Sequence, residues 1–166
     1  EEHKGVLFLI EAFKSIPPPY EGGGWGRLEL LIVGDGSKIK KAKELARGNE
    51  SIKILGKKNK DEVASLMREA DCLIVPSLCY ENSPTVIYEA FAVGLPVIAS
   101  RIGGISELLS DNCGIVFEPD NSADLIKKMK RAIENYGELE RNSKKALEKI
   151  KKYSADKYIG SLIKQI

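Results

Sequence analysis

The sequence predicts an α/β fold, an open parallel sheet with helices on both faces, formed as a single domain. Short apolar runs of strand length recur along the chain and resemble strands buried on both faces. Segments with the periodicity of amphipathic helices separate these runs. Apolar residues make up 43% of the 166 residues, which is enough for one hydrophobic core. This alternation favours parallel strands joined by helical crossovers.

The expected elements follow from these patterns in chain order. Strongly apolar runs predict buried strands at 28–33, 72–75 and 96–99, and weaker runs predict strands at 51–55 and 114–117. Helices are expected at 37–47, 61–68, 83–93, 121–136, 138–152 and 155–166. Ser83 and Pro84 mark a helix start, because Ser caps helices and Pro is favoured at the first helical position. The segment 17–24, rich in Pro and Gly, is expected to be a loop.

Composition excludes several classes of function. The 26 Lys and Arg residues nearly balance 24 Asp and Glu, so the net charge of +2 gives no electrostatic case for nucleic-acid binding. No apolar run approaches the roughly 18 residues that span a bilayer. The three cysteines form no CxxC pair and the chain has one His, which argues against a zinc site and favours reduced, buried thiols in a cytoplasmic protein. An opening without Met suggests a fragment, and abundant Lys, Glu and Ile suggest a heat-adapted source.

The segments that follow the expected strands are the candidate ligand-binding loops. In an open parallel sheet, ligands bind outside the carboxyl ends of the strands. The segments there are rich in Gly, polar or charged residues, which favours a phosphate-bearing or sugar ligand: 34–36, 56–58, 76–85 and 101–104. Gly34-Asp35-Gly36 resembles the start of the dinucleotide-binding fingerprint G-x-G-x-x-G. The position of the third glycine is occupied by Ile39, however, and the acidic residue expected after the second strand is absent. We therefore interpret Gly34 to Gly36 as a tight turn rather than an NAD or NADP site.

Two carboxylates lie in one of these candidate ligand-binding segments and in the helix that follows it. Glu81 falls in the loop after the 72–75 strand, and Glu89 falls within the first two turns of the next helix. Thr85 and Glu89 are four residues apart and share a helix face. Free backbone N–H groups at a helix N-terminus bind anions, so a diphosphate fits here. Glu89 could accept hydrogen bonds from ribose hydroxyls, with Glu81 beside the sugar, where oxocarbenium character develops during glycosyl transfer.

The stretch 70–119 contains several motifs that together are specific to one protein family. It contains Pro76-Ser77, the pair Glu81 and Glu89, the segment GLPVI at 94–98 and the loop GGISE at 103–107. Upstream lie VGDG at 33–36, ILGK at 54–57 and Lys4-Gly5 before LIEAF at 9–13. With these motifs the chain resembles the donor-binding half of family 4 glycosyltransferases (glycosyl transferases group 1), and the resemblance implies that Lys4-Gly5 and LIEAF belong to the first helix of that domain. These enzymes have the GT-B fold, in which two Rossmann-like domains face each other across a cleft. The resemblance covers nearly the whole chain.

The resemblance implies a role for each matching residue. Lys4 would neutralise the diphosphate leaving group, and backbone around Lys57 and Lys58 would bind the nucleobase. Glu81 would contact the donor sugar as the catalytic residue, and Glu89 would hold the ribose. Polar groups and backbone N–H groups would be supplied to sugar and phosphate by Asn82, Ser83 and Thr85. The resemblance further implies transfer with retention of configuration and without a metal, and no DxD pair of metal ligands occurs in the sequence.

Residues 1–166 are accordingly expected to form one donor-binding domain, with a C-terminal helix at 153–166. The acceptor-binding N-terminal domain and the family's phosphate-binding Arg lie outside this sequence, so the chain alone should bind a nucleotide sugar but transfer poorly. The favoured donor is a mannosyl or glucosyl group on GDP or UDP, and the acceptor is a glycan, a lipid-linked glycan or a small metabolite. The expected location is the cytoplasm, with peripheral contact at the inner membrane face as a further option.

Three alternatives remain open at this stage. A GT-B-like sugar-nucleotide epimerase shares the architecture, and a non-catalytic nucleotide-sugar-binding module would keep the fold without the chemistry. The individual residues also have simpler interpretations, because Glu81, Glu89, Lys4, Lys57 and Lys58 could each be solvated surface groups. The Lys-rich helix around 144–152 is interpreted as a solvated basic face.

Overall fold

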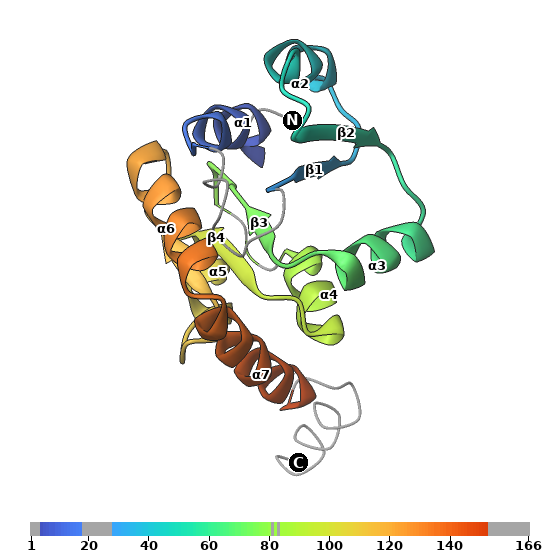
Figure 1. Ribbon diagram of the computed structural model, residues 1–166. Coiled ribbons are helices and arrows are strands. Elements are labelled where there is room, and N and C mark those ends of the chain that lie inside the picture. The colour runs from blue at the N-terminus through green and yellow to red at the C-terminus, as the bar shows by residue number, and fades with distance from the viewer. Residues whose placement is uncertain (1–3, 18–27, 81, 83, 153–166) are drawn as a thin grey trace.

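The computed structural model describes residues 4–17, 28–80, 82 and 84–152 of the chain. Strands and helices alternate along most of it (Figure 1). The strands are β1 (Leu30–Val33), β2 (Ile52–Gly56), β3 (Leu73–Val75), β4 (Val97–Ser100) and β5 (Ile115–Phe117). The helices are α1 (Val6–Lys14), α2 (Ile39–Ala46), α3 (Lys60–Glu69), α4 (Thr85–Val93), α5 (Gly104–Leu108), α6 (Ser122–Glu134) and α7 (Tyr136–Lys152). The α/β class is therefore confirmed, and the helix expected at 153–166 lies outside the described residues.

The strands form two parallel sheets. β1 pairs with β2, with Leu30 opposite Ile52, and β4 lies between β3 and β5, with Ile98 opposite both Ile74 and Ile115. In the part of the chain that the structure describes, β1 and β3 are not paired, so the parallel strands predicted from the sequence form two sheets there. Apolar runs indicate which segments are strands, but they carry no information about which strand edges meet.

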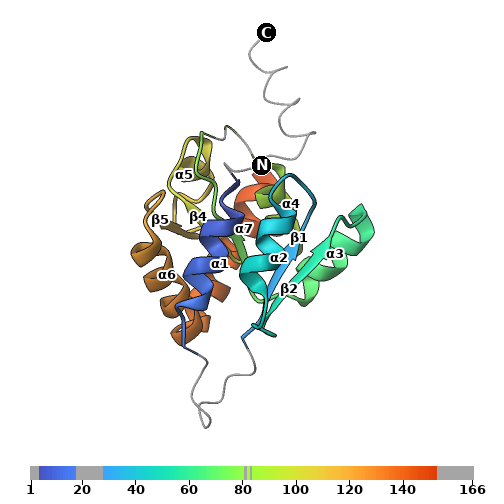
Figure 2. The same cartoon turned by 90° about the horizontal axis from the view of Figure 1, so that it is seen from above.

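Helices cover both faces of the sheets, as predicted. On one face α1 lies between α2 and α6 (Figure 2), and this core includes residues of both sheets. Its buried side chains include Leu9, Ile10, Phe13, Leu30, Ile52, Ile98, Phe117, Leu125 and Met129. The other face carries α3, α4, α5 and α7, packed on the sheet of β3, β4 and β5. The core there includes Met67, Val75, Ile87, Phe91, Val97, Ala99, Ile105, Leu108 and Ala146.

The helix starts differ from one another in how they are capped. Asn59 and Glu62 form a reciprocal capping box at α3, and the Asn121 side chain accepts a hydrogen bond from the Asp124 N–H at α6. The helix predicted from residue 83 begins two residues later, at Thr85, and Pro84 is its N-cap rather than its first helical residue. The extended backbone of Pro84 (ψ 114°) explains the shift, and Ser83 lies outside the described residues. α5 was not predicted, because its five residues include Gly104 and follow Gly103 in a segment interpreted as a turn.

All three cysteines are free thiols, but they differ in exposure. Cys113 is buried, Cys72 is half-buried, and burial raises the pKa of the Cys72 thiol to about 12. Cys79 is exposed, so the expectation of buried thiols is wrong at this position. Among the described helices, none is both long and apolar enough to cross a membrane.

Candidate functional site

The candidate site lies at the carboxyl ends of β3 and β4, where three chain segments pack backbone to backbone. Gly5, at the start of α1, adopts a left-handed conformation (φ 67°) against Pro76, which directly follows β3. A Cβ at Gly5 would overlap the Pro76 carbonyl oxygen. A Cβ at Gly104, the first residue of α5, would likewise overlap the carbonyl oxygen of Asn82. Two glycines thus bring the starts of α1 and α5 into direct contact with the β3–α4 loop.

The first turns of α4 present the side chains that the sequence singled out. Thr85 and Glu89 are both exposed, which confirms that they share the outer face of the helix. Ile87, Ala90 and Phe91 are buried in the core and fix the orientation of that face. Asn82 is exposed in the loop before α4. Glu81 lies outside the described residues, as does Ser83, so their predicted roles stay predictions.

Backbone N–H groups at this site have no side-chain caps. The N-caps of α1, α4 and α5 make no side-chain capping hydrogen bond, and neither α1 nor α4 has an acidic residue in its first turn. By contrast, α3 and α6 have Asn caps and acidic first turns. The first N–H groups of a helix need partners, and the helix dipole favours an anion there. The starts of α1 and α4 therefore have the electrostatics of an anion-binding site.

Lys4 directly precedes Gly5 and is exposed. Its position in the chain places its backbone next to the contact of Gly5 with Pro76, in the loop that leads from β3 to α4. The structure thus brings together the segments that carry Lys4, Asn82, Thr85 and Glu89. A cation beside uncapped helix N-termini adds to their attraction for an anion.

Lys57 and Lys58 belong to the other sheet. The loops after β1 and β2 meet there, where the Gly34 N–H donates to the Gly56 carbonyl at 2.8 Å. Lys57 is exposed, whereas the Lys58 ammonium pairs with Glu62 at 2.8 Å, in the first turn of α3. The hydrogen bond from Lys58, and then that from the Asn59 N–H, hold the pKa of the Glu62 carboxyl below its usual value. The Lys58 side chain therefore helps to fix the start of α3, and Lys57 is the better placed of the two to meet a ligand.

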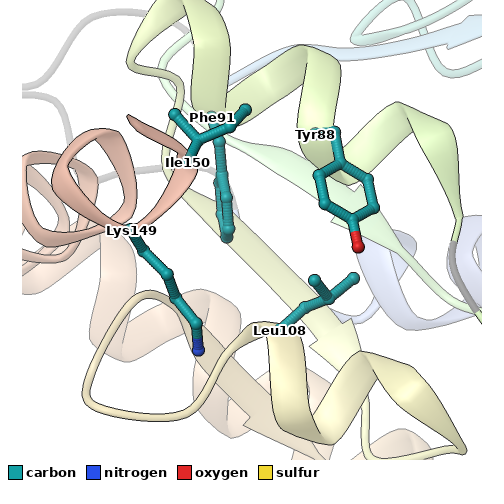
Figure 3. A pocket seen from close by; sticks show the side chains of 5 residues that line it. All are labelled: Tyr88, Phe91, Leu108, Lys149 and Ile150. Atoms are coloured by element: carbon teal, nitrogen blue, oxygen red, sulfur yellow. The ribbon is translucent and has the colours of Figure 1, made fainter. Parts of the chain in front are cut away.

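Lys149 of α7 forms hydrogen bonds at the end of α5, a role that the sequence did not predict. Figure 3 shows Tyr88 and Phe91 of α4 facing Leu108 of α5, with Lys149 and Ile150 of α7 closing the same interface. The Lys149 ammonium donates to the Glu107 carbonyl and to the Ser110 hydroxyl, both at 2.7 Å, and its side chain is only 13% exposed. The interpretation of this lysine as part of a solvated face is therefore wrong. Periodicity could not reveal it, because the partners of Lys149 are 42 and 39 residues away.

We expect Lys149→Met to lower the free energy of unfolding by about 1–2 kcal/mol, since it leaves two acceptors at the end of α5 without their donor. Met keeps most of the apolar stem, so the loss reports mainly the hydrogen bonds. The control is Lys145→Met on the same helix, where the side chain is exposed and the change should stay within about 0.5 kcal/mol. Urea denaturation of both variants measures the difference. Equal stability of the two variants would contradict the role given to Lys149.

No group of three or more His, Cys, Asp or Glu side chains that could hold a metal ion is present in the described ranges. The segments that meet at the site offer backbone N–H groups, hydroxyl and amide groups, the exposed carboxylate of Glu89 and the lysine Lys4. This arrangement can bind an anion and hydrogen-bond to the hydroxyls of a neutral sugar. The fold is therefore that of an α/β domain with parallel strands, and its candidate ligand site lies at the carboxyl edge of those strands.

Comparison with known proteins gives the family. The chain belongs to the glycosyl transferases group 1 family, whose model matches residues 1–152. It is 37% identical over 135 residues to the uncharacterized glycosyltransferase MJ1178 of Methanocaldococcus jannaschii, covering 80% of this chain and 35% of that protein. It is 33% identical over 135 residues to the amylovoran biosynthesis glycosyltransferase AmsK of Erwinia amylovora, covering 75% of this chain and 31% of AmsK. The chain thus spans about a third of the length of these relatives.

The same fold is also found in solved structures. The crystal structure of Anabaena Alr3699/HepE in complex with UDP superposes with a TM-score of 0.83 at 22% identity, covering the whole of this chain and 46% of that one. The same protein has been solved with UDP-glucose, with a TM-score of 0.82. The resemblance to a group 1 glycosyltransferase domain is therefore confirmed in both sequence and fold. The assignment to family 4 in particular stays a prediction.

Proposed function

We propose that this chain is the donor-binding domain of a glycosyltransferase that takes a hexose from a nucleotide-diphosphate sugar, with retention of configuration and without a metal. The observation that carries the proposal is the meeting of uncapped helix starts at the carboxyl ends of β3 and β4, with Glu89 exposed on the first turns of α4. An anion and a hydroxylated ring placed side by side would satisfy both features. A sugar nucleotide contains both.

In this proposal the diphosphate lies against the starts of α1 and α4. The N–H groups of those turns supply donors, and the dipoles of the two helices favour negative charge at their ends. Lys4 stabilises the charge that develops on the leaving diphosphate, which is the work that a metal ion does in other transferases. Asn82 and Thr85 are both exposed and add polar groups beside the sugar and phosphate.

The two glutamates take different parts of the donor. Glu89 accepts hydrogen bonds from the ribose hydroxyls, and its exposure at the α4 surface leaves its carboxylate available for them. Backbone around Lys57 and Lys58 meets the nucleobase at the loop after β2. Glu81 lies near the transferred sugar, where its negative charge stabilises the oxocarbenium-like transition state. The acceptor attacks from the face that the leaving group vacates, so Glu81 need not form a covalent intermediate.

The donor we propose is a mannosyl or glucosyl group on GDP or UDP. Anabaena HepE was crystallised with UDP and UDP-glucose, which supports the glucosyl and UDP option. AmsK is named for amylovoran biosynthesis, which supports a glycan acceptor, and lipid-linked or small acceptors belong to the same proposal. The acceptor would be bound by a second, N-terminal domain of the longer protein. We propose a cytoplasmic location, including peripheral contact at the inner membrane face.

Turnover in a chelator tests the proposal. We expect the longer protein that contains this domain to transfer hexose from UDP- or GDP-sugars at an undiminished rate in excess EDTA, because Lys4 and the helix starts neutralise the leaving group. Product formation is followed by mass spectrometry, and NMR of the new linkage gives its anomeric configuration. A transferase known to need Mn²⁺ serves as the control that the chelator works. Loss of transfer in EDTA, or an inverted product, would contradict this mechanism.

A further inference from the structure

Helix α2 is far more basic than the rest of the chain. Five of the 26 Lys and Arg residues lie in residues 38–47, but only one of the 24 Asp and Glu residues does. This ten-residue segment therefore has a net charge of +4, and the other 156 residues together have a net charge of −2. The small net charge of the whole chain thus hides one strongly basic helix, which the proposed donor site does not use.

Four of these cations point away from the core. Lys40, Lys43 and Arg47 are exposed, and their spacing of three and four residues places them in one stripe along the outer side of α2 and its C-cap. Lys41 is exposed on the flank of that stripe. In the ranges that the structure describes, none of these four residues forms an ion pair. We call Lys40, Lys41, Lys43 and Arg47 the α2 basic face, and its charges are available to an external anion.

The apolar side of α2 is already used by the core. Ala42 is buried, and Leu45 and Ala46 pack against the core that also contains α1. The Lys14 ammonium of α1 donates to the Leu45 carbonyl at 3.1 Å, which ties the end of α2 to α1 and adds a further exposed cation. Because α2 cannot turn its apolar side outward without leaving this core, a partner would be held by charge and not by apolar insertion.

The α2 basic face belongs to a layer of three helices. α1 packs against α2 on one side and against α6 on the other (Figure 2). The outer side of α6 adds two exposed lysines, Lys127 and Lys130. Exposed acidic side chains on the three helices are fewer than the exposed cations: Glu11, Glu44 and Glu134. Positive charge is thus spread over the outside of the layer and does not converge on one point.

This distribution distinguishes among anionic partners. Small anions are bound where donors converge, whereas side chains on the convex surface of a helix diverge. Single-stranded nucleic acids are bound by cations interleaved with aromatic side chains, and residues 38–47 contain no aromatic residue. A bilayer with anionic lipids is broad, and its lipids can move to meet separate cations on flexible lysine stems. The layer therefore fits anionic lipid headgroups best.

We propose that the α2 basic face, with Lys14 beside it, is a docking surface for a bilayer that contains anionic lipids. The helix lies on the headgroups without entering the hydrocarbon. α1 begins at the candidate site, so docking of the layer that contains α1 and α2 holds that site beside the bilayer. This inference rests on the peripheral location in the proposed function, to which it gives a surface, but it does not depend on sugar transfer.

Sedimentation with vesicles tests the docking surface. At about 0.1 M salt, the 166-residue chain should bind vesicles of phosphatidylcholine with about 30% phosphatidylserine, and should not bind vesicles of phosphatidylcholine alone. The triple variant Lys40→Gln, Lys43→Gln and Arg47→Gln should bind the anionic vesicles about 100-fold more weakly, because each cation near the surface contributes about 5-fold.

A second triple variant is the matched control. Lys144→Gln, Lys145→Gln and Lys151→Gln remove the same charge from exposed positions on α7, which packs on the face of the sheet opposite to α1. This variant should lose less than about 3-fold in binding, because charges more than a Debye length from the bilayer are screened. Gln has nearly the helix propensity of Lys, so both variants should keep the fold, and circular dichroism checks this.

Three results would overturn the proposal. The first is failure of the unmodified chain to bind the anionic vesicles. The second is an equal loss of binding in the two triple variants, which would show a response to net charge alone. The third is release of the bound chain by polyglutamate at the same charge concentration, which would assign the face to an acidic polypeptide. Binding of UDP and GDP is measured without vesicles, so failure of docking and failure of the proposed function are told apart.

Discussion

Glu81→Ala in the longer protein should lower the rate of sugar transfer by about 100-fold to 1000-fold, the usual cost of removing one preorganised group that stabilises transition-state charge. Binding of the nucleoside diphosphate alone should change little, because Glu81 is assigned to the sugar and not to the ribose or phosphates. Initial rates and a diphosphate titration separate the two effects. The matched control is Glu44→Ala on α2, an exposed carboxylate that should leave both quantities unchanged.

The same variant distinguishes the alternative functions. A non-catalytic module would have no transfer activity for Glu81→Ala to remove. An epimerase would consume the sugar nucleotide without an acceptor and release an isomer of the donor. Transfer that is unaffected by Glu81→Ala would contradict the role given to this residue.

Gly5→Ala should lower the free energy of unfolding by about 3 kcal/mol and weaken diphosphate binding with it. Left-handed backbone costs a non-glycine residue about 1–2 kcal/mol, and forcing a Cβ onto the Pro76 carbonyl adds about 1–3 kcal/mol. Because the contact is with backbone, relief would require α1 to move away from β3. That movement would separate Lys4 and the start of α1 from the start of α4.

Two further glycines divide this effect into its parts. Gly48 has a similar left-handed conformation (φ 78°) with no atom near its would-be Cβ, so Gly48→Ala measures the conformational cost alone. Gly104 lacks a positive φ but contacts the Asn82 carbonyl, so Gly104→Ala measures the steric cost alone. Urea denaturation gives all three values. A Gly5→Ala variant no less stable than Gly48→Ala would show that the contact of α1 with Pro76 is unimportant.

Local patterns predicted the elements better than their assembly. Apolar runs and helical periodicity placed β1 to β5 and most helices within a few residues, because burial on one or both faces leaves a direct trace in residue order. These patterns could not show that β1 and β3 are unpaired among the described residues, because the pairing of a strand depends on which other strand lies beside it in the folded chain. The α1 helix was expected only from the resemblance, and the five-residue α5 was missed because two glycines precede its core residues Ile105 and Leu108.

The site was predictable where chemistry and helix geometry coincide. Thr85 and Glu89 could be placed on one exposed face because their spacing matches a helical turn, and the structure confirms that face. The assignment of backbone around Lys58 to the nucleobase stays a prediction, and what the structure adds is that the Lys58 side chain pairs with Glu62, four residues on, at the start of α3. The contacts of Gly5 with Pro76 and of Gly104 with Asn82 join residues far apart in sequence, so only the folded chain reveals them.

Calorimetric titration of the longer protein with UDP, GDP and ADP in EDTA tests the central claim most directly, with Glu89→Ala and the control Glu44→Ala run beside it. We predict that one diphosphate binds without metal, that Glu44→Ala binds it equally well, and that Glu89→Ala binds it about 10-fold to 100-fold more weakly, as expected for the loss of charged hydrogen bonds to the ribose. Failure of all three diphosphates to bind would contradict the donor-binding function. Binding that Glu89→Ala leaves unchanged would contradict the ribose site at the start of α4.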